Sequence, residues 1–236
     1  MCENADRGGR RRLVRSAQTS GPNPRYHKRH RPRRQAPERH ELPGTSMNDL
    51  TPTQQQVLAL LAGYRTHNPR DEQSRREFSE FAAAHADCCE RTLSVGHFTG
   101  SAWLVSGDGE RVLLTHHRKL GRWLQLGDHA DGDGDLARVA LREAEEESGL
   151  TGLSLNPEIF DLDRHSIPAR GAEPTHWHYD VRFAIRAVAG EQFAVSEESH
   201  DLAWRSVSEI VNDAEADESL RRMGRKWLGR KWLGWD

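Results

Sequence analysis

The feature that most restricts the fold of this chain is a change of hydrophobic spacing that recurs from residue 51 onward. Segments with the period of a helix alternate with segments that have the two-residue period, or the short apolar run, of a strand. Helices are predicted from Pro52, over 71–90, over about 135–148 and over about 206–228, and strands over 97–105, 111–115, 155–166 and 178–188. A strong turn signal at 106–110 joins the first two strands into a hairpin. Interleaved strands and helices predict an α/β or α+β single domain rather than a helix bundle or a β-sandwich.

The first 46 residues differ in charge from the rest of the chain. They hold 12 of the 34 lysine and arginine residues, four acids and five of the ten prolines, so their net charge is +8 and the remainder carries −10. With almost no apolar periodicity, this segment is expected to be disordered. A basic arm that binds nucleic acid is one explanation; a solvated tail, or a start codon placed ahead of the true start at Met47, is another. The charge of −10 on the folded part argues against nucleic acid as a partner.

The composition indicates the cellular compartment. No stretch approaches the roughly 20 apolar residues of a membrane-spanning helix, and no apolar segment of a secretory signal follows the basic start. The cysteines are Cys2 and the adjacent pair Cys88 and Cys89. So few cysteines, without the spacing of a disulfide framework, indicate a reducing compartment. We therefore expect a cytoplasmic protein with no membrane partner.

The most informative segment is an acidic helix that follows a loop rich in glycine and aspartate. At about 100° per residue, Glu143, Glu146 and Glu147 fall within roughly 100° of arc, on a side that is otherwise apolar. A solvated acidic face, the usual explanation of a glutamate run, accounts for Glu145 but not for these three. Carboxylates on a stripe that faces the core repel one another unless a cation neutralises them. The helix therefore predicts a site for a hard divalent cation such as Mg²⁺, which binds carboxylates together with water and substrate phosphate.

Residues 142–150, Arg-Glu-Ala-Glu-Glu-Glu-Ser-Gly-Leu, resemble the second half of the Nudix box, G-x5-E-x7-R-E-U-x-E-E-x-G-U, in which U is a bulky apolar residue. The resemblance extends in organisation over about residues 95–210. It implies a Nudix-like α/β/α sandwich with a mixed sheet, preceded by helices and the disordered N-terminal arm. It also implies a metal-dependent hydrolase that cleaves a diphosphate bond in a small-molecule nucleoside-diphosphate derivative. Glu143, Glu146 and Glu147 would bind the Mg²⁺ or Mn²⁺ ion.

The same resemblance implies the catalytic residues. Glu146 belongs to the metal-binding set, and Arg142, one helical turn before it, is expected to hold it in place. Members of the family often take a general base from a later loop, for which 196–200 is the candidate stretch and Glu198 the chosen residue. Domains of this kind often dimerise, so a homodimer is one of the expected assemblies.

The first half of the box departs from the family pattern. Asp128 stands in the glycine slot, and Gly134 stands in the glutamate slot. In the family this glycine allows a tight loop and this glutamate supports the helix; Asp131, Asp133 or Asp135 is a candidate replacement for the missing carboxylate. The alternative to an active hydrolase is a catalytically weakened Nudix-fold module that binds or senses a nucleotide. The three intact glutamates oppose that alternative, because a sensor does not need them all.

Several histidines are candidates for a pocket lining, a second metal site or ordinary surface positions. They are His116, His117, His129, His165, His176 and His178. His176, His178 and Asp180 alternate along a predicted strand and therefore share one of its faces, and the spacing of the two histidines suits a metal. A histidine at the position of His129 binds metal in the Nudix-related isopentenyl-diphosphate isomerases. Those enzymes need a cysteine where this chain has Gly127, which argues against isomerase activity.

Four segments are predicted along the chain. They are a disordered basic Pro/Arg-rich arm at 1–46, a helical segment packing on the core at 47–92, the Nudix-like hydrolase domain at 93–224 and a Trp/Leu-rich C-terminal extension at 225–236. The extension contains two copies of Arg-Lys-Trp-Leu-Gly. They could form a surface patch for a membrane or a partner, and the simpler explanation is a local duplication that lengthens the last helix.

Overall fold

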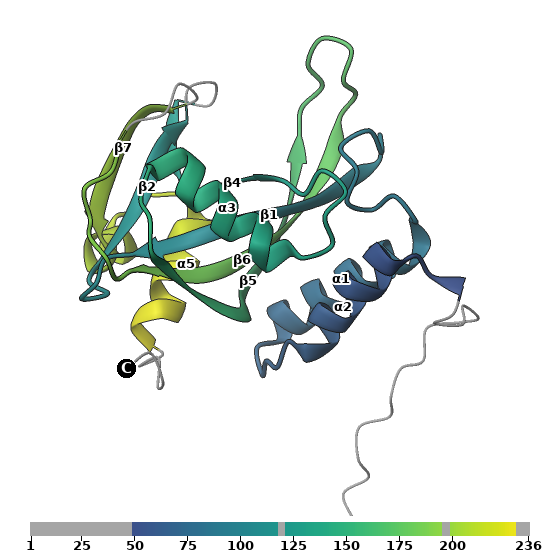
Figure 1. Cartoon of the computed structure of the whole chain (residues 1–236), viewed down its shortest axis with the longest axis horizontal. Helices are drawn as coiled ribbons and strands as arrows, with labels where there is room; N and C mark the ends of the chain where they lie inside the picture. Colours follow the sequence, from purple (N-terminus) through teal and green to yellow (C-terminus); the bar gives the residue numbers. More distant parts are fainter. Residues whose placement is uncertain (1–48, 118–120, 195–198, 230–236) are drawn as a thin grey trace, which may run out of the picture. The chain divides into compact units, whose positions relative to one another are not determined.

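The computed structural model of the 236-residue chain describes residues 49–117, 121–194 and 199–229 (Figure 1). The predicted disordered arm, the candidate base Glu198 and the second copy of the terminal repeat lie outside the described residues. The helices are α1 (Pro52–Gly63), α2 (Pro69–Ala84), α3 (Leu136–Ser148), α4 (Val207–Asn212) and α5 (Glu218–Gly229). The strands are β1 (Gly96–Val105), β2 (Arg111–His117), β3 (Arg122–Leu124), β4 (Leu126–His129), β5 (Leu153–Ile167), β6 (His176–Ala187) and β7 (Ser199–Ser206).

Local capping signals confirm the predicted ends of two helices. Helix α1 begins after Thr51, whose hydroxyl accepts from the backbone N–H of Gln54 while the Gln54 side chain accepts from the Thr51 N–H, which is a capping box. Helix α3 begins after Asp135, whose carboxylate accepts from the Arg138 N–H, and ends at Gly149 with a left-handed φ of 69°. The acidic helix therefore occupies the residues that the sequence predicts.

Three predicted segments differ from the structure. Helix α2 ends at Ala84 instead of residue 90, because the chain turns there and the carbonyl of Cys88 accepts from the N–H of Phe98 in β1. The helical stretch predicted over 206–228 is divided into α4 and α5, and the Asp217 carboxylate accepts from the Ser219 N–H at the start of α5. Residues 127–129 belong to the strand β4 and not to a loop, since they pair with β1.

The seven strands form one mixed sheet with the order β3-β2-β1-β6-β5, in which β4 also pairs with β1 and β7 with β2. β1 and β6 are parallel, and the other pairs are antiparallel. β5 and β6 form a long hairpin that extends beyond the neighbouring strands (Figure 1). β1, which is buried along its whole length, is the central strand and meets β2, β4 and β6.

Helices cover both faces of this sheet (Figure 1). On one face Phe98 and Leu104 of β1 pack in a core with side chains of α1, α2 and α3. On the other face Trp103 and Val105 of β1 pack with α4 and α5, including Trp227 from the first copy of the terminal repeat. The predicted α/β/α sandwich is confirmed. None of the helices in the described part of the chain is long and apolar enough to cross a membrane.

Candidate active site

An open pocket of about 450 Å³ lies at the acidic face of α3. Its lining consists of five carboxylates and two guanidinium groups: Asp128, Asp131, Glu143, Glu146, Glu147, Arg91 and Arg142. We call this set the carboxylate pocket. All three glutamates that the helical spacing places on one side of α3 are among its lining residues, whereas Glu145 is exposed and is not.

Glu143 and Arg142 form an ion pair at the edge of this pocket. Glu143 is 9% exposed, and its Oε1 accepts from Nη2 of Arg142 at 2.7 Å and from Nε at 3.2 Å. Burial raises the pKa of Glu143, and the Arg142 charge opposes that rise only in part, since Asp128 and Glu146 add negative charge nearby. The structure thus pairs Arg142 with Glu143 and not with Glu146, which corrects the expected partner.

Glu147 is held by the backbone of β4. Its Oε1 accepts from the Gly127 N–H at 2.7 Å. Gly127 has a φ of 143°, and a Cβ at this position would lie 2.4 Å from Ser101 Oγ and 2.6 Å from the Gly100 carbonyl. Only glycine fits so close to β1, so Gly127 fixes the amide that orients Glu147.

The two departures from the box pattern have a structural explanation. Asp128 lies in β4 opposite Gly100, and its φ is not positive. This slot therefore does not require a glycine in this chain. Gly134 is buried against α1: a Cβ there would lie 2.6 Å from Gln56 Oε1 and 3.0 Å from the Thr53 carbonyl. A glutamate here would crowd the Thr53 carbonyl and require the Gln56 side chain to move, so the N-terminal helix disfavours it.

Two nearby aspartates stabilise the start of α3 in place of the glutamate of the Nudix box. Asp135 is the N-cap, and the Asp133 carboxylate accepts from the Asp135 N–H and pairs with Arg138 at 2.7 Å. Asp131 instead lines the carboxylate pocket, where it pairs with Arg91 at 3.1 Å. Of the three candidate replacements, Asp133 and Asp135 stabilise the helix and Asp131 adds to the pocket's charge.

The donor set of the carboxylate pocket fits a hard divalent cation. Every side chain that could ligate an ion there offers carboxylate oxygen, and the carboxylates outnumber the guanidinium groups by five to two. Mg²⁺ and Mn²⁺ prefer such ligands. Burial opposes ionisation of Asp128, but its contacts with His129 and the charge of Arg91 outweigh burial and lower its pKa to about 2.

On the opposite face of β4, five histidines gather in a group that we call the histidine cluster. Its members are His97, His129, His165, His176 and His178. Burial, followed by the neighbouring imidazoles, lowers the pKa of His97 to about 4 and that of His178 to about 2. Four of these histidines are among the candidates that the sequence indicates; His97 is not, because it stands in an apolar strand pattern.

Other predicted histidine-site residues lie elsewhere. His116 packs against Trp123 of β3, with 5.2 Å between ring centroids, and the side chain of His117 lies outside the described residues. Asp180 shares a strand face with His178, but its carboxylate pairs with Arg182 at 2.7 Å and accepts from Thr99 and Ser101. Asp180 therefore belongs to a different group of charges.

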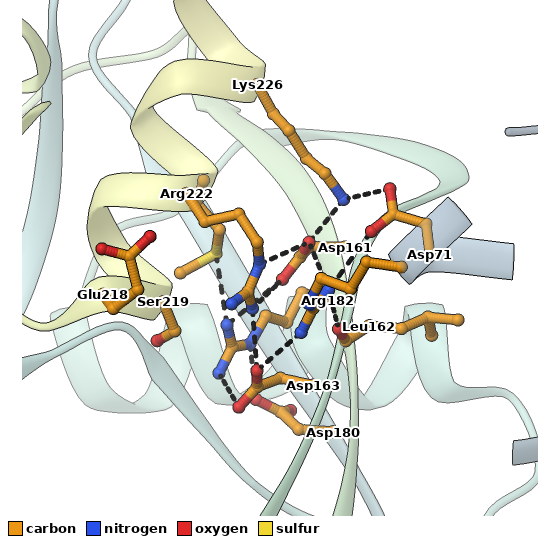
Figure 2. A network of polar contacts seen from close by, with 12 residues as sticks. Asp71, Asp161, Leu162, Asp163, Asp180, Arg182, Glu218, Ser219, Arg222 and Lys226 are labelled. Carbon is orange, nitrogen blue, oxygen red and sulfur yellow. Dashed lines mark hydrogen bonds and ion pairs between the residues drawn. The ribbon is translucent and has the colours of Figure 1, made fainter. Parts of the chain in front are cut away.

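That group is a buried ion-pair network that joins the sheet to α2 and α5. It contains Asp71, Asp161, Asp163, Asp180, Arg70, Arg182, Arg222 and Lys226. Figure 2 shows Arg222 and Lys226 reaching from α5 to Asp161, with Arg182 between the aspartates. Burial opposes ionisation of Asp161 and Asp163, but pairing with Arg222, Arg182 and neighbouring groups lowers the pKa of both. Carboxylates and cations are equal in number, so this network is neutral without an added ion.

Comparison with known proteins agrees with this architecture. A family model described as the NUDIX domain matches residues 97–227, more than half of the chain. The chain therefore belongs to the Nudix family. No curated protein gives a significant sequence match.

Solved structures with a similar fold have low sequence identity to this chain. An Ap4A hydrolase from C. elegans is 17% identical, covers 56% of this chain and 95% of its own, and has a TM-score of 0.45. A MutT protein from Methanosarcina mazei Go1 is 17% identical over 58% of this chain and 96% of its own, with a TM-score of 0.45. A NUDIX-family hydrolase from Clostridium perfringens is 23% identical over 56% and 96%, with a TM-score of 0.41. At such identities and scores these structures carry no information about the substrate.

Proposed function

We propose that the protein hydrolyses a diphosphate bond of a nucleoside-diphosphate derivative, with Mg²⁺ or Mn²⁺ held by Glu143, Glu146 and Glu147. The observation that carries this proposal is the excess of carboxylates in the pocket, five against two guanidinium groups. A diphosphate would add more negative charge, so the substrate and these carboxylates can share the pocket only with a cation between them. The ion, when bound, neutralises the diphosphate and activates water for attack on phosphorus.

The chain's own residues hold the carboxylates in place. The Gly127 amide donates to Glu147, and Arg142 donates to Glu143. These bonds fix two carboxylates of one helix at the pocket and leave the exposed Glu146 beside them. Because both fixed groups are oriented before substrate arrives, little reorganisation is needed on binding. We assign Glu146 to catalysis, Arg142 to positioning Glu143, and Glu198 to the general base.

The remaining expectations become part of this proposal. The substrate is a small molecule, the protein works in the cytoplasm without nucleic acid, and a homodimer is one of its expected assemblies. The carboxylate pocket is open to solvent, so a free nucleotide derivative could reach it once a cation is bound.

The test is turnover by the full-length protein with Mg²⁺ and then Mn²⁺, against a panel of nucleoside-diphosphate derivatives, with coupled release of phosphate as the readout. Glu146→Gln should lower kcat by about 10²–10³-fold, the range seen when a group that stabilises transition-state charge is removed. Glu145→Gln is the matched control, because it removes the same charge from the same helix outside the pocket. Its kcat should equal that of the unmodified protein.

Two other outcomes are informative. Nucleotide and metal binding without turnover would replace the hydrolase with the sensor alternative. Turnover that survives Glu146→Gln, or that falls equally in Glu145→Gln, would contradict the assigned role of the carboxylate pocket.

A further inference from the structure

The histidine cluster lies where four strands meet. His97 of β1 is the register partner of His178 of β6, and His178 is the partner of His165 of β5. His129 of β4 is paired with Thr99, two residues along β1 from His97. Because side chains alternate along a strand, His97, His129 and His178 point to one face of the sheet, and Asp128 points to the other. The cluster therefore lies on the other face of the sheet from the carboxylate pocket and meets that pocket at His129, whose Nδ1 contacts Asp128 and Arg91.

The three imidazoles converge closely enough to share one ion. One ring nitrogen from each of His97, His129 and His178 lies within 4.8 Å of the other two. Nitrogens bound to one zinc ion at about 2.0 Å lie roughly 3.3 Å apart in tetrahedral geometry, so shifts of about 1 Å would complete the site. Such shifts are within the reach of side-chain rotation.

His97 supplies a second, independent observation. It is 2% exposed, and neither ring nitrogen has a hydrogen-bond partner among the described residues. The Leu93 carbonyl favours its protonated form slightly but lies outside hydrogen-bond geometry. Buried polar atoms nearly always have a hydrogen-bond partner. A buried imidazole that lacks one and lies close to two other imidazoles therefore indicates a ligand site.

We propose that His97, His129 and His178 form a second metal site, which binds Zn²⁺ or a similar late first-row transition metal ion. The donor set selects the ion, because imidazole nitrogen suits zinc whereas the all-oxygen carboxylate pocket suits Mg²⁺ or Mn²⁺. His176 lies beside the site, with its Nε2 3.3 Å from that of His178 and its Nδ1 2.9 Å from the Pro174 carbonyl. It acts as a positioning residue for His178.

Three protein ligands leave one position of a tetrahedral ion open, as in catalytic zinc sites. The ligands come from β1, β4 and β6, so an ion bound there would also tie the β5–β6 hairpin to the centre of the sheet. Binding to the folded state alone would raise the midpoint of thermal unfolding.

The experiment titrates the chelator-treated full-length protein with Co²⁺, whose visible absorption reports tetrahedral coordination, in the presence of excess Mg²⁺. We expect one tightly bound equivalent with an intense tetrahedral band, displacement by Zn²⁺, and no thiolate charge-transfer band. His129→Gln and His178→Gln should each weaken binding at least about 100-fold. His176→Gln should weaken it less. Substitution of buried His97 also perturbs packing, so the two less buried ligands carry the test.

Matched controls separate this site from the rest of the chain. His67→Gln removes an exposed histidine between α1 and α2, and Glu146→Gln alters the carboxylate pocket; both should retain the tetrahedral band. Failure to observe that band, or its persistence at equal affinity in His129→Gln and His178→Gln, would overturn the proposal. Since the readout is cobalt binding and not hydrolysis, this proposal and the proposed function can fail separately.

Discussion

The carboxylate pocket and the buried ion-pair network are both rich in acidic side chains, and they differ in how that charge is neutralised. In the network, four carboxylates meet four cationic side chains, and Arg182 alone pairs with three of the aspartates. In the pocket, five carboxylates meet two guanidinium groups. This difference shows that an acidic cluster near a core indicates a cation site when its negative charge exceeds the positive charge of the neighbouring basic side chains. Where the two charges balance, the acidic side chains stabilise the fold.

The largest expected effect is the loss of Arg182 from the buried ion-pair network. Arg182 is 2% exposed, so Arg182→Met leaves three aspartates without their shared partner and should lower the free energy of unfolding by about 3–5 kcal/mol. Arg70→Met is the matched control, because Arg70 pairs with Asp71 and Asp163 but is 40% exposed. It should cost no more than about 1 kcal/mol. Urea unfolding of both variants checks this, and equal losses would show that burial does not set the energy of the network.

A smaller change in unfolding free energy is expected when the glutamate of the Nudix box is restored at position 134. Gly134→Glu supplies the glutamate of the pattern but drives its side chain into Gln56 and the Thr53 carbonyl of α1. We expect a loss of about 2 kcal/mol in unfolding free energy, the usual cost of overpacking. Gln56→Ala should recover part of this loss in the double variant, as measured by urea unfolding. A stable Gly134→Glu protein with unchanged unfolding would mean that α1 does not disfavour the glutamate.

Acid should weaken the buried ion-pair network. Pairing holds the folded-state pKa of Asp161 and Asp163 below the unfolded value of about 3.9, so their contribution to stability is present above that pH and is lost as the pH falls further. Asp163→Asn should therefore flatten the decline in melting temperature below about pH 4. A decline as steep as that of the unmodified protein would place the acid sensitivity outside the network.

The smallest expected effect concerns Glu143 in the metal-free protein. Burial raises the pKa of this carboxyl, so its ionised form is less stable in the folded protein than in the unfolded chain. Glu143→Gln should raise the metal-free stability slightly, by less than about 1 kcal/mol, since it also loses the Arg142 pair. The same variant should gain less stability from added Mg²⁺ than the unmodified protein does. Thermal unfolding with and without Mg²⁺ measures both effects.

Local signals made much of the fold predictable. Thr51 and Pro52 define the start of α1, and Asp135 and Gly149 enclose the acidic helix, because capping depends on residues a few positions apart. The helical spacing also brings Glu143, Glu146 and Glu147 to one pocket. These features need no knowledge of the rest of the chain.

Contacts between distant segments were not predictable in this way. Asp161 meets Arg222 and Lys226 only through the packing of α5 on β5. The glycine at position 134 is explained by Gln56, which lies far away in the sequence. His97 joins the histidine cluster because β1 and β6 are parallel with His97 opposite His178, a register that no local pattern specifies.

The most direct test of the central claim is Mn²⁺ binding by the full-length protein, measured by electron paramagnetic resonance of the free ion. We expect Mn²⁺ to bind in competition with Mg²⁺, Glu146→Gln to weaken its binding at least about tenfold, and Glu145→Gln to leave its binding unchanged. His67→Gln should also leave it unchanged, because this exposed histidine is not among the lining residues of the carboxylate pocket. Equal Mn²⁺ affinity in the unmodified protein and in Glu146→Gln would contradict the claim that the excess charge of this pocket is neutralised by a bound cation.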